Sequence, residues 1–418
     1  MIIKGPKIAV VGAGLCGLSA AYHMHRLCSS TSITIFERLP RIGGRVCTCD
    51  KLKSEHGGEF FLGCELDGVE PEYKLDTSPS LKELFKSLGV DVKEERDWAA
   101  FSFNGKVKRG SPDEVARKLL HRSAKHRLPK LIAKSTTRIR NSNESFGEWV
   151  HSRLSGDREA IRFIKILLAG ETCAPMDHLS IKYGCESLAT ASSPTEKWFV
   201  VGRGTSRLAK SLYRKSRANI KMGTDVTAVN ERRQGVQVKW TQVGDVKRED
   251  FFDAVIIATP DGERLLNITA SGHFHQYLSL LIPYDKEPTL RDHPGLPLTH
   301  GLYVDNSLNY IKTKKVNEQW IVRALIPYAD RWQRYSDDRV KTMCKKNLKQ
   351  LLSSDVCPSA EPDLMRWEFG LPCGGQPEFY QRFGRAIFLA GDRFSKWPSM
   401  AGAIISGEKV ANAACYQF

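Results

Sequence analysis

The segment from Lys7 to Gly17 has the spacing most typical of nucleotide-binding chemistry. An apolar run leads into G-x-G-x-x-G, and the residues behind it, Leu18 to Leu27, are compatible with a helix. Gly12 permits a tight turn, Gly14 lets the backbone approach a pyrophosphate, and Gly17 allows close packing of helix on strand. The phosphates would lie against free N–H groups at a helix N-terminus. We therefore predict a dinucleotide site here.

A carboxylate stands where the ribose of such a dinucleotide requires one. Residues 32–36 read as a second strand, and this strand ends in Glu37, twenty residues past Gly17. A carboxylate at this distance accepts hydrogen bonds from the adenosine ribose. The first βαβ unit is therefore predicted to bind a nucleotide.

Two further glycine pairs favour a flavin over a nicotinamide. Residues 38–45 combine the pair Gly43-Gly44 with three arginines, which suit a protein that wraps the whole of FAD. Gly57-Gly58 lets backbone pass an isoalloxazine edge with no Cβ in the way. We therefore predict FAD as the cofactor.

The C-terminal part carries a matching motif. Residues 386–392 read as a strand that ends in Gly391-Asp392, and a helix is expected from Ser399 through Val410. Asp392 could accept hydrogen bonds from ribityl hydroxyls. The dipole of the helix could stabilise negative charge on the reduced ring.

In this order, the segments GAGLCGL, FERLPRIGGR, HGGEF, DVTAVN, FDAVIIATP and FLAGDRFSKWPSMAGAIISGEKVA resemble the flavin amine oxidase family. That family includes monoamine, polyamine and L-amino-acid oxidases, with renalase, protoporphyrinogen oxidase and carotenoid desaturases as relatives. The resemblance covers the FAD-binding portions, and the middle of the chain matches nothing that we can name. It implies an FAD-dependent oxidoreductase.

The same resemblance implies the individual FAD contacts. Val226 would hold the adenine through its backbone. The contacts implied are Ala13, Cys16, Glu37, Arg38, Gly44, Arg45, Gly58, Glu59, Phe60, Val226, Asp392, Met400 and Ala401. To these the motifs add Gly12, Gly14, Gly17, Gly43, Gly57, Gly391 and Ser399.

Catalytic side chains are few, because FAD itself takes hydride from an activated C–H bond and O2 or another acceptor reoxidises it. Many amine oxidases hold a lysine near the flavin through water. Its counterpart falls near Thr299-His300, on a strand without lysine. His300 could relay a proton there, or it could be a strand-end histidine satisfied by solvent. Trp397 could line the cavity, and Ser399 stands where monoamine oxidases place a tyrosine.

The charge of the chain bears on the substrate. Lys and Arg number 63 against 47 Asp and Glu, a net charge of +16. Such a field repels a polycation and suits a zwitterionic or anionic substrate, such as an amino acid. Residues 115–143 hold nine Lys or Arg and no acid. This basic segment is either a surface for an anionic membrane, nucleic acid or partner, or a solvated helical face.

The 11 cysteines include no C-x-x-C motif, and no histidines pair at metal spacing. Cys47 and Cys49 read as two buried thiols, so no metal site is predicted. Cys373 lies near the position where some amine oxidases attach flavin, but its spacing to Gly391 is shorter than expected for that linkage and the flanking residues differ. A free thiol, and hence noncovalent FAD, is therefore favoured. Thiols of this kind fit a reducing, cytoplasmic location. We expect neither a signal peptide nor a transmembrane helix, because no apolar run is long enough.

These elements predict an α/β protein in which a Rossmann-like FAD-binding domain carries an inserted substrate domain of sheet plus helices. The FAD-binding domain is expected to be discontinuous, over 1–70, 195–265 and 360–418, with 71–194 and 266–359 forming the substrate domain. Strands are expected over 298–304 and 320–328, followed by a charged helix through Lys349.

The function expected is FAD-dependent oxidation next to an amine nitrogen. Two alternatives remain: a desaturase or renalase-like dihydropyridine oxidase, and a non-catalytic flavoprotein scaffold that binds a partner through 115–143.

Overall fold

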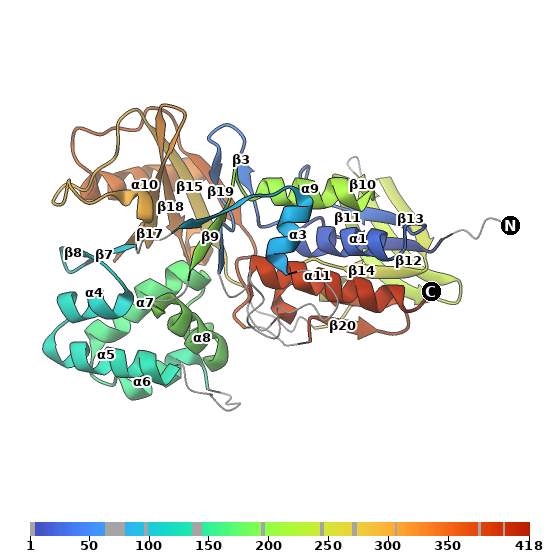
Figure 1. Cartoon of the computed structure of the whole chain (residues 1–418), viewed down its shortest axis with the longest axis horizontal. Helices are drawn as coiled ribbons and strands as arrows, with labels where there is room; N and C mark the ends of the chain where they lie inside the picture. The colour runs from blue at the N-terminus through green and yellow to red at the C-terminus, as the bar shows by residue number, and fades with distance from the viewer. Residues whose placement is uncertain are drawn as a thin grey trace.

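The computed structural model describes residues 5–62, 80–95, 99–135, 144–193, 197–242, 246–269, 274–305, 307–374, 378–395 and 398–418. Figure 1 shows a nucleotide-binding half on one side, and a large sheet above a group of helices on the other. Within the described ranges, none of the helices has the length and apolar character that crossing a bilayer requires.

A six-stranded sheet forms the centre of the nucleotide-binding half. Five of its strands are parallel, and only the edge strand β20 runs antiparallel. The apolar central strands are buried on both faces, as a parallel sheet covered on both sides requires. In order, the strands are β10 (Asn219–Lys221), β2 (Ser32–Phe36), β1 (Lys7–Val11), β14 (Ala254–Ile257), β21 (Ile387–Ala390) and β20 (Tyr380–Phe383).

Helices cover one face of this sheet, and a small antiparallel sheet covers the other. The helices are α1 (Leu15–Leu27), α9 (Ser206–Ser216) and α11 (Met400–Cys415). The antiparallel strands are β11 (Thr224–Arg232), β12 (Gly235–Gln242) and β13 (Val246–Phe252). Helices α1 and α11 pack so closely that a Cβ at Gly407 would lie 2.3 Å from the Cys16 carbonyl oxygen. This three-layer arrangement confirms the Rossmann-like α/β prediction.

A seven-stranded sheet forms the other half. All its neighbours are antiparallel except β16 and β7, which are parallel. In order, the strands are β19 (Asp363–Trp367), β15 (Tyr277–Tyr284), β18 (Gln319–Ile326), β17 (Tyr310–Val316), β16 (Leu302–Val304), β7 (Ala100–Phe103) and β8 (Lys106–Arg109). Helix α10 (Asp337–Leu351) packs against it through Val340, Cys344 and Leu348.

Five helices pack beside the β7–β16 end of that sheet. They share one core with Phe101, Phe103 and Tyr303. The helices are α4 (Pro112–Leu119), α5 (Arg122–Ser135), α6 (Phe146–Arg153), α7 (Arg158–Thr172) and α8 (Ile181–Ser192). Ser or Asp side chains cap four of them.

Short elements join the two halves. Strands β5 (Phe60–Leu62), β9 (Trp198–Val201) and β6 (Val92–Glu95) form a small antiparallel sheet, and β3 (Thr48–Cys49) pairs with β4 (Ser54–Glu55). Helix α3 (Leu81–Leu88) packs in the nucleotide-side core, whereas β19 belongs to the seven-stranded sheet. The domain limits drawn from the sequence stay a proposal.

One predicted strand is wrong in its first half. Residues 298–300 form a 3-10 turn, and the strand begins only at Leu302. Gly301 separates the two with φ +88°, and a Cβ there would lie 2.1 Å from the Tyr310 hydroxyl oxygen. The chain therefore turns where the apolar pattern suggested continuous strand.

Candidate active site

The turn between β1 and α1 has the geometry that phosphate binding needs. Gly12 has φ +100°, and a Cβ there would lie 2.8 Å from the Ala258 carbonyl oxygen. A Cβ at Gly17 would lie 2.0 Å from the Gly12 oxygen. Gly14 caps α1 with no side chain over the helix end, so the first N–H groups face the cavity. The glycine spacing thus has a steric cause in this structure.

Glu37 lies at the end of β2 and lines the same cavity. Its buried carboxylate accepts from the backbone N–H of Ala13 at 2.7 Å and of Leu39 at 2.8 Å. Two carboxylate oxygens offer about four acceptor positions, so two remain for ribose hydroxyls. The residue fits the ribose-binding role proposed for it.

The second glycine pair packs directly on the first turn. Gly43 bridges to Gly14, its N–H donates to the Ala13 carbonyl at 2.8 Å, and its φ is +105°. A Cβ at Gly44 would lie 3.0 Å from the Gly14 Cα. The two loops together therefore make a wall of bare backbone along the cavity, as a pyrophosphate requires.

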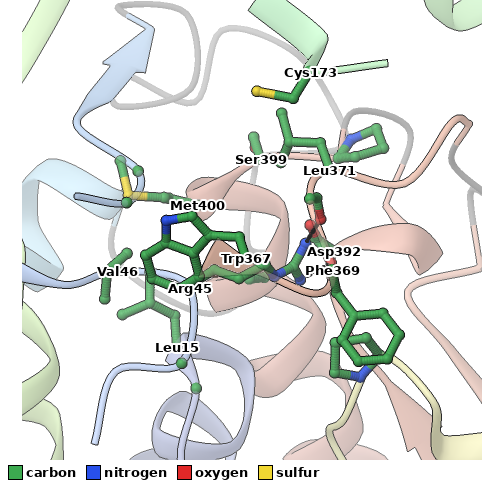
Figure 2. Close-up of a pocket in the computed structure, with 18 of the residues that line it drawn as sticks. Leu15, Arg45, Val46, Cys173, Trp367, Phe369, Leu371, Asp392, Ser399 and Met400 are labelled. Atoms are coloured by element: carbon green, nitrogen blue, oxygen red, sulfur yellow. Dashed lines mark hydrogen bonds and ion pairs between the residues drawn. The ribbon is translucent and has the colours of Figure 1, made fainter. Parts of the chain in front are cut away.

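Arg45 and Asp392 join the N-terminal and C-terminal motifs. The Arg45 guanidinium donates to Asp392 at 2.6 Å and to the Gly370 carbonyl at 2.8 Å. Figure 2 shows this pair beside Trp367 and Met400, with Cys173 at the edge of the cavity away from Leu15. Both charged groups line the cavity, where Asp392 retains acceptor capacity for a hydroxyl.

Helix α11 starts at the cavity wall. The hydroxyl of Ser399 accepts from the Gly402 N–H at 2.9 Å, and both Ser399 and Met400 line the cavity. A Cβ at Gly58 would lie 2.8 Å from the Met400 sulfur. The glycine therefore lets the Met400 thioether pack against bare backbone at the start of the helix.

One cavity of about 1220 Å³ connects all of these elements with the helical part. Its nucleotide end is bare glycine backbone and Glu37, and its other end is aromatic and also carries a carboxyl group and a guanidinium group. The residues at that second end include Phe101, Leu167, Glu171, Cys173, Tyr183, Tyr277, Tyr303, Tyr310, Arg323 and Leu325. The shape and the donor set fit an extended dinucleotide that carries a ring, with room for a substrate beyond it.

Most of the cofactor residues expected from the sequence line this cavity. They are Gly12, Gly14, Cys16, Glu37, Arg38, Gly43, Gly44, Arg45, Gly57, Gly58, Glu59, Val226, Gly391, Asp392, Ser399 and Met400. Ala13, Gly17 and Ala401 do not line it. The side chain of Phe60 lies outside the described residues. The individual FAD contacts stay proposals.

The two catalytic candidates are not placed by the structure. Backbone of His300 ends the 3-10 turn 298–300, but its side chain lies outside the described residues. Trp397 lies outside them altogether. Both roles stay predictions.

The sequence reasoning missed a buried ionic cluster beside the cavity. Lys312 and Arg323 stand opposite each other on β17 and β18. Glu59 accepts from Arg323 at 2.5 Å and from Lys312 at 3.4 Å, and Glu95 accepts from Lys312 at 2.8 Å. Burial opposes the charge of Lys312, yet the adjacent carboxylates hold its pKa above the usual value. The available sequence signal was Arg323, a charged residue inside the otherwise apolar run 321–326 of β18.

It also missed Glu171 and Tyr303. The Tyr303 hydroxyl donates to the Glu171 carboxyl, and both residues line the aromatic end of the cavity. Burial raises the pKa of Glu171 to about 7, although the hydrogen bond from Tyr303 acts in the opposite direction. Glu171 ends an otherwise apolar stretch of α7, so it stands out in the sequence as a charged residue. The sequence does not, however, indicate that Tyr303 is its hydrogen-bond partner.

Comparison with known proteins identifies the family of the chain. The sequence profile described as flavin containing amine oxidoreductase matches residues 15–415. Human prenylcysteine oxidase 1 is 24% identical in an alignment 331 residues long, which covers 66% of this chain and 61% of that protein. The chain therefore spans less than two thirds of this curated relative.

Two solved structures share the fold over almost the whole chain. Cyclohexylamine oxidase from Brevibacterium oxydans IH-35A is 15% identical with a TM-score of 0.72, covering 99% of both chains. Putrescine oxidase bound to putrescine is 16% identical with a TM-score of 0.70, also covering 99% of both chains. At such identities the structures establish the fold alone, while the profile match establishes the family. The chain belongs to the flavin-containing amine oxidoreductase family.

Proposed function

We propose that this protein is an FAD-dependent oxidoreductase whose substrate carries an amine and, in the same molecule, a carboxylate. When bound, FAD supplies the acceptor for hydride from the C–H bond next to the amine nitrogen, and O2 or another acceptor then reoxidises it. Glu37 would hold the adenosine ribose, the N-terminus of α1 the pyrophosphate, and Asp392 the ribityl chain. FAD would be noncovalent: Cys373 is buried and does not line the cavity.

The observation that carries the amine assignment is the Glu171 carboxyl in the aromatic end of the cavity. Tyr303 holds this carboxyl, and its ring stacks on Phe101 with centroids 4.8 Å apart. Tyr310 lies next to Tyr303 with centroids 5.1 Å apart. An ammonium group placed here would meet a carboxylate and electron-rich ring faces together. Its charge would offset the desolvation that disfavours ionised Glu171.

The surroundings of Arg323 support the inference that the substrate also carries a carboxylate. Its two terminal nitrogens donate to Glu59 at 2.5 Å and to the Gly57 carbonyl at 2.8 Å. Its Nε has no hydrogen-bond partner among the described residues, although it is buried beside the cavity. A substrate carboxylate would satisfy that donor once the atoms that cover Nε move aside. The name of the human relative, prenylcysteine oxidase, also denotes an amino acid joined to an apolar chain.

Anaerobic mixing of the purified flavoprotein with amines, amino acids and dihydronicotinamides tests the proposal. We expect amino-acid-like amines to bleach the flavin absorbance, because only they satisfy both Glu171 and Arg323. Simple polyamines should bleach it much more slowly. Bleaching by dihydronicotinamides alone would favour the renalase-like alternative, and no bleaching by any compound would favour the scaffold alternative.

We also propose that the basic segment 115–143 contacts an anionic surface or partner. Arg117, Lys118, Arg127, Lys130 and Lys134 are exposed on α4 and α5. The leucines between them, Leu119, Leu120, Leu128 and Leu131, are buried in the core of the helical part. These leucines are therefore not available to insert into a membrane, and any contact would be electrostatic. Residues 136–143 lie outside the described part of the chain.

A cytoplasmic location stays a proposal. Its support is that the ten cysteines in the described residues are all free thiols.

A further inference from the structure

A cysteine, a histidine and a carboxylate meet outside the cavity lining. Cys49 lies on β3, His56 directly follows β4, and Asp363 begins β19. One ligand atom of each lies within 4.8 Å of the others. Asp363 is 307 residues from His56 in the sequence, so the group exists only in the folded chain.

Two of the distances within the group match those between neighbouring ligand atoms of a tetrahedral zinc site. The Cys49 sulfur and the His56 Nε2 both contact the same Oδ2 of Asp363, at 3.2 Å and 3.3 Å. Zinc bonds of about 2.0–2.3 Å at tetrahedral angles place neighbouring ligand atoms about 3.3–3.6 Å apart. The two contacts to Asp363 would therefore need only small shifts to accept a zinc ion, together with loss of the protons now shared there. The ligand atoms of Cys49 and His56, which lie within 4.8 Å of each other, would close around the ion.

The surroundings orient the ligands. The His56 ring is fully buried, and its Nδ1 lies 3.3 Å from the Ser279 hydroxyl on β15. Metal-bound histidines usually have such a partner on the second ring nitrogen. Asp363 is about half exposed, with 51% of its side chain accessible, so an ion and a water molecule can reach the group from solvent.

We propose that Cys49, His56 and Asp363 bind one Zn²⁺ ion, with water as the fourth ligand. The mixture of thiolate, imidazole and carboxylate suits this borderline-soft ion. Binding transfers the Cys49 thiol proton to solvent and forms the Zn–S bond, with no change in oxidation state.

The proposed ion would lie behind the wall of the flavin cavity. His56 is followed directly by Gly57, Gly58 and Glu59, which line that cavity. Its carbonyl accepts from the indole N–H of Trp367 at 3.2 Å, and Trp367 also lines the cavity. Zinc would therefore fix the hairpin that carries this wall.

The test measures zinc binding to the reduced, flavin-loaded full-length protein after chelator treatment, by equilibrium dialysis and elemental analysis. We expect one zinc per chain in the wild type. Cys49→Ser and Asp363→Asn should each weaken binding at least about tenfold, and Ser279→Ala by about 10–100-fold. Cobalt should give tetrahedral ligand-field bands at wavelengths beyond the flavin absorbance, and Cys49→Ser should lose them.

Two matched controls use the exposed Cys357 and the exposed Asp50, which lies on the same hairpin but outside the group. Cys357→Ser and Asp50→Asn should bind zinc like the wild type. Asp363→Asn changes a partly exposed side chain, so its flavin content should stay normal and its zinc affinity remains measurable. Absence of stoichiometric zinc in the wild type, or equal binding by Cys49→Ser and Asp363→Asn, would overturn the proposal.

Discussion

Replacing Glu171 with glutamine separates the proposed substrate role from a structural role. Glutamine keeps the size of the side chain and an acceptor for the Tyr303 hydroxyl, but it removes the negative charge. A hydrogen bond between charged groups contributes about 1.5–3 kcal/mol. We therefore expect kcat/KM for the amine that bleaches the flavin to fall about 10–150-fold, measured by stopped-flow reduction.

The pH dependence gives an independent signature. Burial raises the pKa of Glu171 to about 7. Only the ionised carboxylate attracts the ammonium, so wild-type kcat/KM should rise as pH increases through about 7. Glu171→Gln should lack that limb. Glu159→Gln is the matched control, because Glu159 lies in the first turn of the same helix but does not line the cavity.

Stability should change in the opposite direction to activity. The raised folded-state pKa of Glu171 means that the neutral carboxyl stabilises the fold below its ordinary pKa of 4.5, and that this stability is lost as pH rises through about 7. The shift corresponds to about 3 kcal/mol. Glu171→Gln should therefore be more stable than the wild type at pH 8, in urea unfolding. Unchanged kcat/KM together with an intact pH limb would refute the substrate role.

Three further predictions address the cofactor and the basic segment. Acid precipitation should release all flavin as FAD; flavin retained in the pellet would indicate a covalent link, with Cys373 to be checked first. Glu37→Ala should weaken FAD binding to the apoprotein about 10–150-fold, since a charge-assisted hydrogen bond to ribose is lost; unchanged affinity would make Glu37 a purely structural residue. The wild type should bind anionic liposomes or nucleic acid at about 50 mM salt, and this binding should weaken steeply as salt is added. Replacing Arg127, Lys130 and Lys134 with serine should abolish the binding without loss of flavin. If the wild type does not bind at that ionic strength, general adhesion to anionic surfaces is excluded.

The nucleotide half could be predicted from sequence because its constraints are local. A turn that must hold φ +100° at Gly12, or a helix that must approach backbone at Gly17, leaves glycine at fixed spacing. The strand before Glu37 and the helix after Ser399 follow from apolar runs and a cap. Each of these features depends on a few consecutive residues, so it can be predicted from the sequence alone.

The substrate end depended on contacts between distant segments. In the sequence, Lys312 and Arg323 are two cationic residues on separate strands. Only the pairing of β17 with β18 brings both side chains into contact with Glu59. Glu171 acquires its partner only when α7 packs beside β16, where Tyr303 lies. Neither the periodicity nor the spacing of residues in the sequence predicts these contacts. The sequence therefore identified the cofactor but not the substrate.

The Glu171 carboxyl and the Arg323 guanidinium both line the aromatic end of the cavity, and the proposed pairing of one substrate with both explains how a strongly cationic chain could bind an amine. The net charge of +16 would repel a polycation at long range. Within the cavity, however, Glu59 compensates Arg323, and Glu171 carries the charge that faces the aromatic end. A zwitterion has no net charge for the long-range field to repel, and it supplies one partner to each group. Selection in this cavity would then depend on the pairing of both charged ends of one substrate.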